Sequence, residues 1–166
     1  MQRTVLGIDP GLAHTGWGVL RQDGGKLSCV AYGCVATDGS AGLAVRLRKI
    51  SDQIGAVVAR YGPTCLGIES VWFGDNTTSA FATGQARGAA LVPCAGLDVA
   101  EFTPRQIKLA VVGTGTAEKD QVAYMVQQVL GLPQLPTPDH AADALAAALC
   151  YTANNSVLAG TVGLGA

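Results

Sequence analysis

The chain has 166 residues, of which 49% are hydrophobic, and both values suit one packed domain. Its 11 Lys and Arg residues nearly balance its 12 Asp and Glu residues, which leaves a formal net charge of −1 at pH 7. This balance excludes a protein that coats nucleic acid by charge alone, and the low charged fraction of 14% excludes a disordered chain or a long coiled coil.

Cysteine usage and the N-terminal sequence indicate a compartment. The five cysteines form an odd set without a Cys-x-x-Cys pair, and only two histidines accompany them. This favours buried thiols in a reducing environment over disulfides or structural zinc. Asp9 stands within the first ten residues, and no apolar run reaches the ~18 residues that a membrane span requires. We therefore expect a cytoplasmic protein without membrane contact.

Three strands are predicted at the start of the chain. An apolar run over residues 3–9 ends in an acid followed by Pro-Gly, which indicates a buried strand and a turn. Two further apolar runs, over 16–20 and 26–36, flank Asp23-Gly24-Gly25, a sequence typical of a hairpin turn. Three sequential strands therefore open the domain.

Helices and two more strands fill the rest of the chain. Apolar residues at helical spacing predict an amphipathic helix over 42–61. The next predicted elements are a strand over 64–69, a small-residue helix over 77–92, a strand over 97–102, and helices over 104–112 and 118–130. A Pro-rich linker leads to an Ala-rich helix that we expect to end near Tyr151. We expect residues 1–151 to form a single domain and residues 152–166, which lack periodicity, to be a flexible tail.

Two of the predicted strands end in a carboxylic acid. Leu6-Gly-Ile-Asp9 and Leu66-Gly-Ile-Glu69 repeat one pattern, in which each acid shares a strand face with the glycine two residues before it. If the two strands are neighbours, Asp9 and Glu69 lie side by side. Burying unpaired carboxylates is costly, and their mutual repulsion adds to the cost. A divalent cation is the simplest compensation.

The Ala-rich helix supplies two further candidate ligands. His140 and Asp143 are three residues apart, so they project from one helical face about 5–6 Å apart. The alternative for these residues, and for Asp139, is an exposed first turn in which acids favour the helix dipole. With Asp9 and Glu69 they make an oxygen-rich site with one nitrogen, which suits Mg²⁺ or Mn²⁺ better than structural zinc. Two such ions about 3.5–4 Å apart would contact the attacking and leaving oxygens of a phosphodiester.

With these residues in place, the sequence closely resembles the RuvC family, the bacterial Holliday junction resolvases of the ribonuclease H-like superfamily. The resemblance covers residues 3–151 and rests on six motifs in family-like order and spacing. They are Leu6-Gly-Ile-Asp-Pro-Gly11 with Thr15-Gly16, Ile68-Glu69, Asn76 with Gly84-Gln-Ala-Arg-Gly88, Thr103-Pro104 with Lys108, Gly113-Thr-Gly-Thr-Ala-Glu-Lys119, and Ala142-Asp-Ala-Leu-Ala146.

The resemblance implies an α/β fold in which helices flank a five-stranded mixed sheet, with three antiparallel strands followed by two parallel ones. It also implies a homodimer that nicks two opposed strands of a four-way DNA junction and leaves 5′-phosphate and 3′-hydroxyl ends. Asp9, Glu69 and Asp143 match the family's catalytic acids. Lys119 matches a lysine near the DNA backbone, although a solvated lysine at a helix start is the alternative. The branch-migration proteins RuvA and RuvB are further partners that the family implies.

His140 departs from the family pattern, since many relatives carry Asp at this fourth ligand position. An imidazole there serves either as a metal ligand or as a catalytic proton-transfer group. The loss of one carboxylate favours the more nitrogen-tolerant Mn²⁺ over Mg²⁺. We therefore expect two divalent cations per subunit, with Mn²⁺ preferred over or alongside Mg²⁺.

Aromatic and basic residues predict contacts to DNA. Trp72 and Phe73 precede a Gly-Asp-Asn loop, and an aromatic residue at the position of Trp72 inserts at the junction centre in the resembling family. Stacking a base on such a ring contributes about 1–3 kcal/mol, although both side chains could instead cover the core. The polar and basic candidates for DNA contact are Asn76, Arg87, Arg105, Lys108 and Lys119.

A stripe of small residues bears on the oligomeric state. Ala80, Gly84 and Gly88 recur every four residues and so line one face of their predicted helix. They could pack within the protomer or against the same helix of a second copy. The implied homodimer favours the second arrangement.

Alternatives from other functional classes share some of these residues. A junction-binding protein in which His140 has weakened catalysis fits the same motifs, as does a ribonuclease H-like nuclease with another nucleic-acid substrate. The Gly7-Ile-Asp-Pro-Gly11 loop with Thr15-Gly16 also resembles the first phosphate loop of actin-like ATPases, but 166 residues do not hold the second lobe that those proteins need.

Overall fold

A computed structural model describes residues 2–71 and 74–161. Five strands form one sheet in the order β3-β2-β1-β4-β5. Their bounds are β1 Gln2–Asp9, β2 His14–Asp23, β3 Lys26–Ala36, β4 Cys65–Glu69 and β5 Asp98–Phe102. The first three strands pair antiparallel, whereas β4 runs parallel to β1 and β5 runs parallel to β4. The predicted fold class is confirmed.

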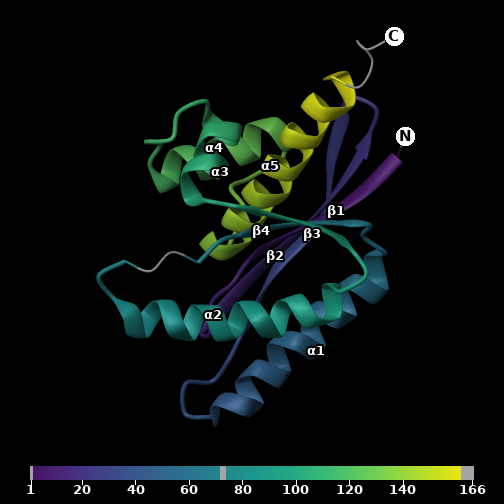
Figure 1. The fold of residues 1–166 in the computed structure, drawn as a ribbon. Coiled ribbons are helices and arrows are strands. Elements are labelled where there is room, and N and C mark those ends of the chain that lie inside the picture. The colour runs from purple at the N-terminus through teal and green to yellow at the C-terminus, as the bar shows by residue number, and fades with distance from the viewer. Residues whose placement is uncertain (1, 72–73, 162–166) are drawn as a thin grey trace.

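Helices cover both faces of this sheet. They are α1 Leu43–Tyr61, α2 Thr77–Leu91, α3 Pro104–Val112, α4 Lys119–Leu130 and α5 Asp139–Thr161, with one 3-10 turn, η1 Val92–Cys94. α1 and α2 lie on one face, whereas α5 lies on the other face together with α3 and α4 (Figure 1). One apolar cluster lies under each helical layer.

Alternation along the strands decides which side chains face α5. Leu6 and Ile8 of β1 are buried in the cluster beneath α1 and α2. Because neighbouring side chains on a strand point to opposite faces, Gly7 and Asp9 point toward α5. β4 repeats the arrangement, which places Glu69 on the same face as Asp9.

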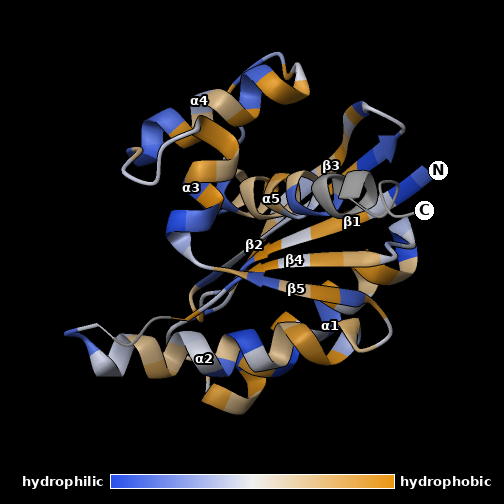
Figure 2. Ribbon diagram, turned by 45° about the horizontal axis from the view of Figure 1, so that its top comes forward, coloured by the Kyte–Doolittle hydropathy of each residue, from blue (hydrophilic) through white to orange (hydrophobic). Residues whose placement is uncertain are grey.

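Glycines on this face let α5 lie directly against the strands (Figure 2). A Cβ at Gly7 would lie 1.9 Å from the Ala144 carbonyl oxygen, and one at Gly16 would lie 1.8 Å from the His140 carbonyl oxygen. A Cβ at Gly67 would also meet the α5 backbone, at 2.5 Å. No side chain fits at such distances. The glycines therefore hold the first turn of α5 close to the strand ends that carry the acids.

α5 extends beyond its predicted end. The sequence predicts an end near Tyr151 and a flexible tail over 152–166, but the helix continues to Thr161. The backbone of this segment stays helical without an apolar periodicity, so the hydrophobic pattern missed the extension.

None of the described helices is both long and apolar enough to cross a membrane. All five cysteines are free. Cys65, Cys94 and Cys150 are buried as expected, whereas Cys29 and Cys34 of β3 are only half-buried.

Candidate metal centre

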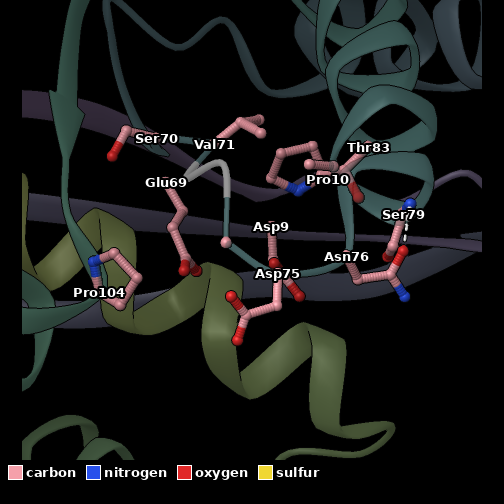
Figure 3. A pocket seen from close by; sticks show the side chains of 12 residues that line it. Asp9, Pro10, Glu69, Ser70, Val71, Asp75, Asn76, Ser79, Thr83 and Pro104 are labelled. Carbon is pink, nitrogen blue, oxygen red and sulfur yellow. Dashed lines mark hydrogen bonds between the residues drawn. The ribbon is translucent and has the colours of Figure 1, made fainter.

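The two strand-end acids come from neighbouring strands. β1 and β4 pair in parallel with Ile8 opposite Ile68, so Asp9 and Glu69 follow at the same edge of the sheet. Both acids line one cavity of about 480 Å³, and their carboxylates point into it (Figure 3). β1 and β4 are therefore neighbours, which is the condition under which the sequence predicts that Asp9 and Glu69 lie side by side.

The first turn of α5 brings two more side chains to this edge. His140 Nδ1 lies 3.0 Å from Asp9 Oδ2. Ligand atoms of Asp9, His140 and Asp143 all lie within 4.8 Å of one another. Among the described residues, Glu69 does not belong to this close group, although the charges of Asp9 and Asp143 act on it.

Burial and repulsion disfavour the charged forms of the strand-end acids. Burial, followed by the charges of Asp9 and Asp143, raises the pKa of Glu69 to about 7. Burial also raises the pKa of Asp9, although the hydrogen bond with His140 opposes this shift. Lys119 Nζ lies 3.0 Å from Asp143 Oδ2, and this contact raises the pKa of the Lys119 ammonium. One lysine thus balances only part of the negative charge.

The donor set fits Mg²⁺ or Mn²⁺. Carboxylate oxygens with one imidazole nitrogen suit both ions, and the close group contains no thiolate that would favour zinc or copper. A bound dication would also supply the positive charge that the raised carboxyl pKa values indicate is missing.

Mn²⁺ binding is expected to strengthen by up to about tenfold per pH unit between pH 6 and 7, because one proton must leave Glu69 before that carboxylate can bind a cation. The pKa of Glu69 is higher in the folded chain than in the unfolded chain, so proton binding stabilises the metal-free fold, and this contribution is fully present below pH 4.5. That contribution is lost as the pH rises from 4.5 through about 7. Calorimetric titration of Mn²⁺ into DNA-free protein across this range measures the affinity. The Glu69→Gln variant should show a flatter profile, and an equally steep profile would contradict the assignment.

Two of the predicted basic residues lie beside the acids. Lys108 of α3 and Lys119 of α4 line a second cavity, of about 210 Å³, together with Glu69 and Asp143. This cavity adjoins the acid cluster, by which we mean Asp9, Glu69 and Asp143, on the side of α3 and α4. Both lysines are therefore placed to meet a phosphate that approaches the cluster from this side.

Other predicted DNA contacts lie around the larger cavity or away from both. Asn76 lines the larger cavity and also caps α2, because its side chain accepts a hydrogen bond from the Ser79 N–H at 3.0 Å. Arg105 is exposed in the first turn of α3. Trp72 and Phe73 lie outside the described residues.

Arg87 is not brought to the acid cluster. Its Nη2 lies 2.7 Å from Glu101 Oε2 of β5, and the arginine side chain is only 17% exposed. This ion pair links α2 to β5, the edge strand of the sheet, so the guanidinium already has a carboxylate partner. Sequence reasoning offered no sign of this pair, because the two residues belong to different elements.

Sequence reasoning also missed residues around the site. Asp75 and Thr83 line the larger cavity (Figure 3). The His14 ring stacks on that of His140, with centroids 5.3 Å apart. No signal in the sequence pointed to His14, because the predicted strand begins at Gly16 and the contact joins β2 to the distant α5.

Comparisons with known proteins agree with this geometry. The family model described as crossover junction endodeoxyribonuclease RuvC matches residues 5–151. The chain belongs to the RuvC family. RuvC from Syntrophomonas wolfei is 44% identical over 149 residues, covering 89% of this chain and 87% of that protein. RuvC from Tolumonas auensis is 47% identical over 156 residues, covering 93% and 89%.

A solved structure extends the similarity to three dimensions. T. thermophilus RuvC in complex with a Holliday junction substrate superposes with a TM-score of 0.88 at 35% identity, covering 93% of this chain and 96% of that one. The predicted enzyme class, crossover junction endodeoxyribonuclease, and the ribonuclease H-like resolvase fold are thereby confirmed for this RuvC family member.

Proposed function

We propose that this chain resolves four-way DNA junctions by nicking two opposed strands, with Asp9, Glu69, His140 and Asp143 holding two divalent cations. The observation that carries the proposal is the close group of Asp9, His140 and Asp143 at one edge of the sheet. The junction bound to the similar T. thermophilus protein supports the substrate class.

Each residue of the site has a distinct part in this proposal. When bound, two divalent cations would supply the positive charge that activates a water molecule and stabilises the departing 3′ oxygen. Asp9 of β1 and His140 and Asp143 of α5 would hold these ions, and Glu69, which lines both cavities, would add a carboxylate. Lys119, held beside Asp143 by its ion pair, contacts the DNA backbone and takes part in catalysis. Nicking by this route leaves 5′-phosphate and 3′-hydroxyl ends.

The decisive experiment incubates end-labelled four-way junctions with the protein and Mn²⁺. Paired nicks at symmetric positions in two opposed strands are the expected result. Linear duplex and RNA–DNA hybrid of matched sequence serve as substrate controls. Equal cleavage of either control would favour a related nuclease, and junction binding without nicks would favour a catalytically weak binding protein.

Mn²⁺ is expected to support faster nicking than Mg²⁺, because the His140 nitrogen suits Mn²⁺ better. Replacing His140 by Asp restores a fourth carboxylate and should raise the Mg²⁺ to Mn²⁺ rate ratio several-fold. Single-turnover rates at saturating concentrations of each ion measure the ratio. Equal wild-type rates in the two ions would contradict the preference.

α2 presents an uncovered face that supports a homodimer. A Cβ added at Gly84 or Gly88 would meet no atom within 4 Å in the protomer. Phe81 of α2 is 65% exposed, and Val92, which begins η1 directly after α2, is 70% exposed. Ala80, by contrast, is buried within the protomer. The glycine part of the predicted stripe is thus available to a second copy, whereas Ala80 is not.

Replacing Gly88 by Glu is expected to convert the dimer to a monomer that remains folded. The new side chain has space in the protomer and favours the helix, but it would place charge in the dimer contact. Light scattering coupled to size-exclusion chromatography measures the mass. Gly96→Glu, at another uncrowded glycine outside α2, is the charge-matched control. A Gly88→Glu dimer as tight as wild type would argue against this interface.

RuvA and RuvB enter the proposal through family membership alone. We propose the bacterial cytoplasm as the compartment of this chain, because five free cysteines suit a reducing environment.

A further inference from the structure

We propose that His14 positions the His140 imidazole for metal binding by stacking against its face. The two ring centroids lie 5.3 Å apart, and the ring planes differ by 6°. His14 is thus a positioning residue that acts through His140. The inference rests on the metal role proposed above for His140.

The backbone on both sides of His14 is held in place. The Thr15 hydroxyl donates to the Gly11 carbonyl at 2.7 Å and accepts from the Gly11 N–H at 3.3 Å. On the other side, the Thr37 N–H donates to the Ala13 carbonyl at 3.0 Å. Since β2 begins at His14, two residues before the predicted run, its ring extends from the fixed end of a paired strand.

The approach of α5 brings the second ring to the first. His14 and Gly16 share a strand face, and the backbone of His140 lies directly over Gly16. From there the His140 ring reaches His14 with one face and Asp9 with its Nδ1 atom. The His140 side chain is 38% exposed, so the loss of His14 would open a ring face to water. Rotation of the freed ring would carry Nδ1 away from Asp9.

The contacts of His14 favour stacking over direct metal ligation. His14 does not belong to the close ligand group found among the described residues. Within that same part of the chain, no hydrogen bond to its ring is present, and its ring contact is the stack on His140. Groups that orient a histidine ligand typically change metal affinity by about 10–100-fold when removed, and we expect the lower end because stacking is weaker than a hydrogen bond.

Mn²⁺ titration of DNA-free protein at fixed pH tests this role in His14→Ala, His14→Gln and His14→Phe. We expect about tenfold weaker Mn²⁺ binding for Ala and Gln, and affinity within about twofold of wild type for Phe, which keeps the ring face. In metal-free protein, NMR signals of the His140 ring should broaden or shift in the Ala and Gln variants but not in Phe. Tyr124→Ala, which removes an exposed ring from α4, is the control and should bind Mn²⁺ as wild type does.

Each outcome decides a separate point. Equal Mn²⁺ affinity in all variants would overturn the inference while leaving the proposed function intact. A loss of Mn²⁺ affinity in His14→Phe as large as that in His14→Ala would also overturn the stacking role, because it would mean that a His14 nitrogen is required. A wild-type protein that neither binds Mn²⁺ nor nicks junctions would overturn both proposals. If His14→Ala does not fold, the comparison of His14→Phe with His14→Gln still distinguishes a requirement for an aromatic ring from a requirement for a polar side chain.

Discussion

Replacing Asp9 by Asn is expected to slow junction nicking by on the order of 10³-fold or more, while junction binding persists. Asp9 ends β1 and belongs to the close ligand group with His140 and Asp143. An amide keeps the size of the side chain but cannot supply the anionic oxygen that a dication requires. Single-turnover nicking in Mn²⁺ measures the rate, and a gel shift in EDTA measures junction binding.

The same variant separates chemistry from folding. Because burial raises the pKa of Asp9, its charged form opposes folding near neutral pH in the absence of metal. Asp9→Asn should therefore unfold at a temperature equal to or above that of wild type in EDTA. Asp52→Asn, which removes an exposed acid from α1, is the matched control and should nick normally. Nicking by Asp9→Asn at the wild-type rate would remove this carboxylate from the mechanism.

Gly7→Ala is expected to destabilise the fold by about 3 kcal/mol or more, a large cost for one methyl group. The new Cβ would lie 1.9 Å from the Ala144 carbonyl oxygen and 2.8 Å from the Ala148 nitrogen. Both atoms belong to the backbone of α5, so neither can turn aside as a flexible side chain would. The helix must shift as a unit, which would also move His140 and Asp143 away from the strand-end acids.

Urea unfolding of metal-free protein measures this cost, and Mn²⁺ titration of the folded fraction measures its effect on the site. Gly96→Ala is the matched control, because a Cβ there meets no atom within 4 Å and should change stability by less than about 0.5 kcal/mol. Equal unfolding midpoints for the two variants would show that the contact between β1 and α5 is less close than described.

Local sequence patterns by themselves determined the elements that carry the candidate site. The apolar runs before Asp9 and Glu69 predict buried strands, and the alternation of side chains places each acid on the face of its neighbouring glycine. The spacing of His140 and Asp143 likewise sets a shared helix face. Each of these properties depends on residues within one strand or one helical turn, so no knowledge of distant contacts was needed.

Contacts between distant segments were decided only by the tertiary structure. The pairing of Arg87 with Glu101 and the stacking of His14 on His140 join elements whose separate sequences carry no sign of each other. The separation of Glu69 from the close ligand group is of the same kind. The physical reason is that such distances follow from how closely two elements pack. Gly16 is an example. α5 approaches β2 closely there because glycine has no side chain and because the α5 backbone passes directly over it.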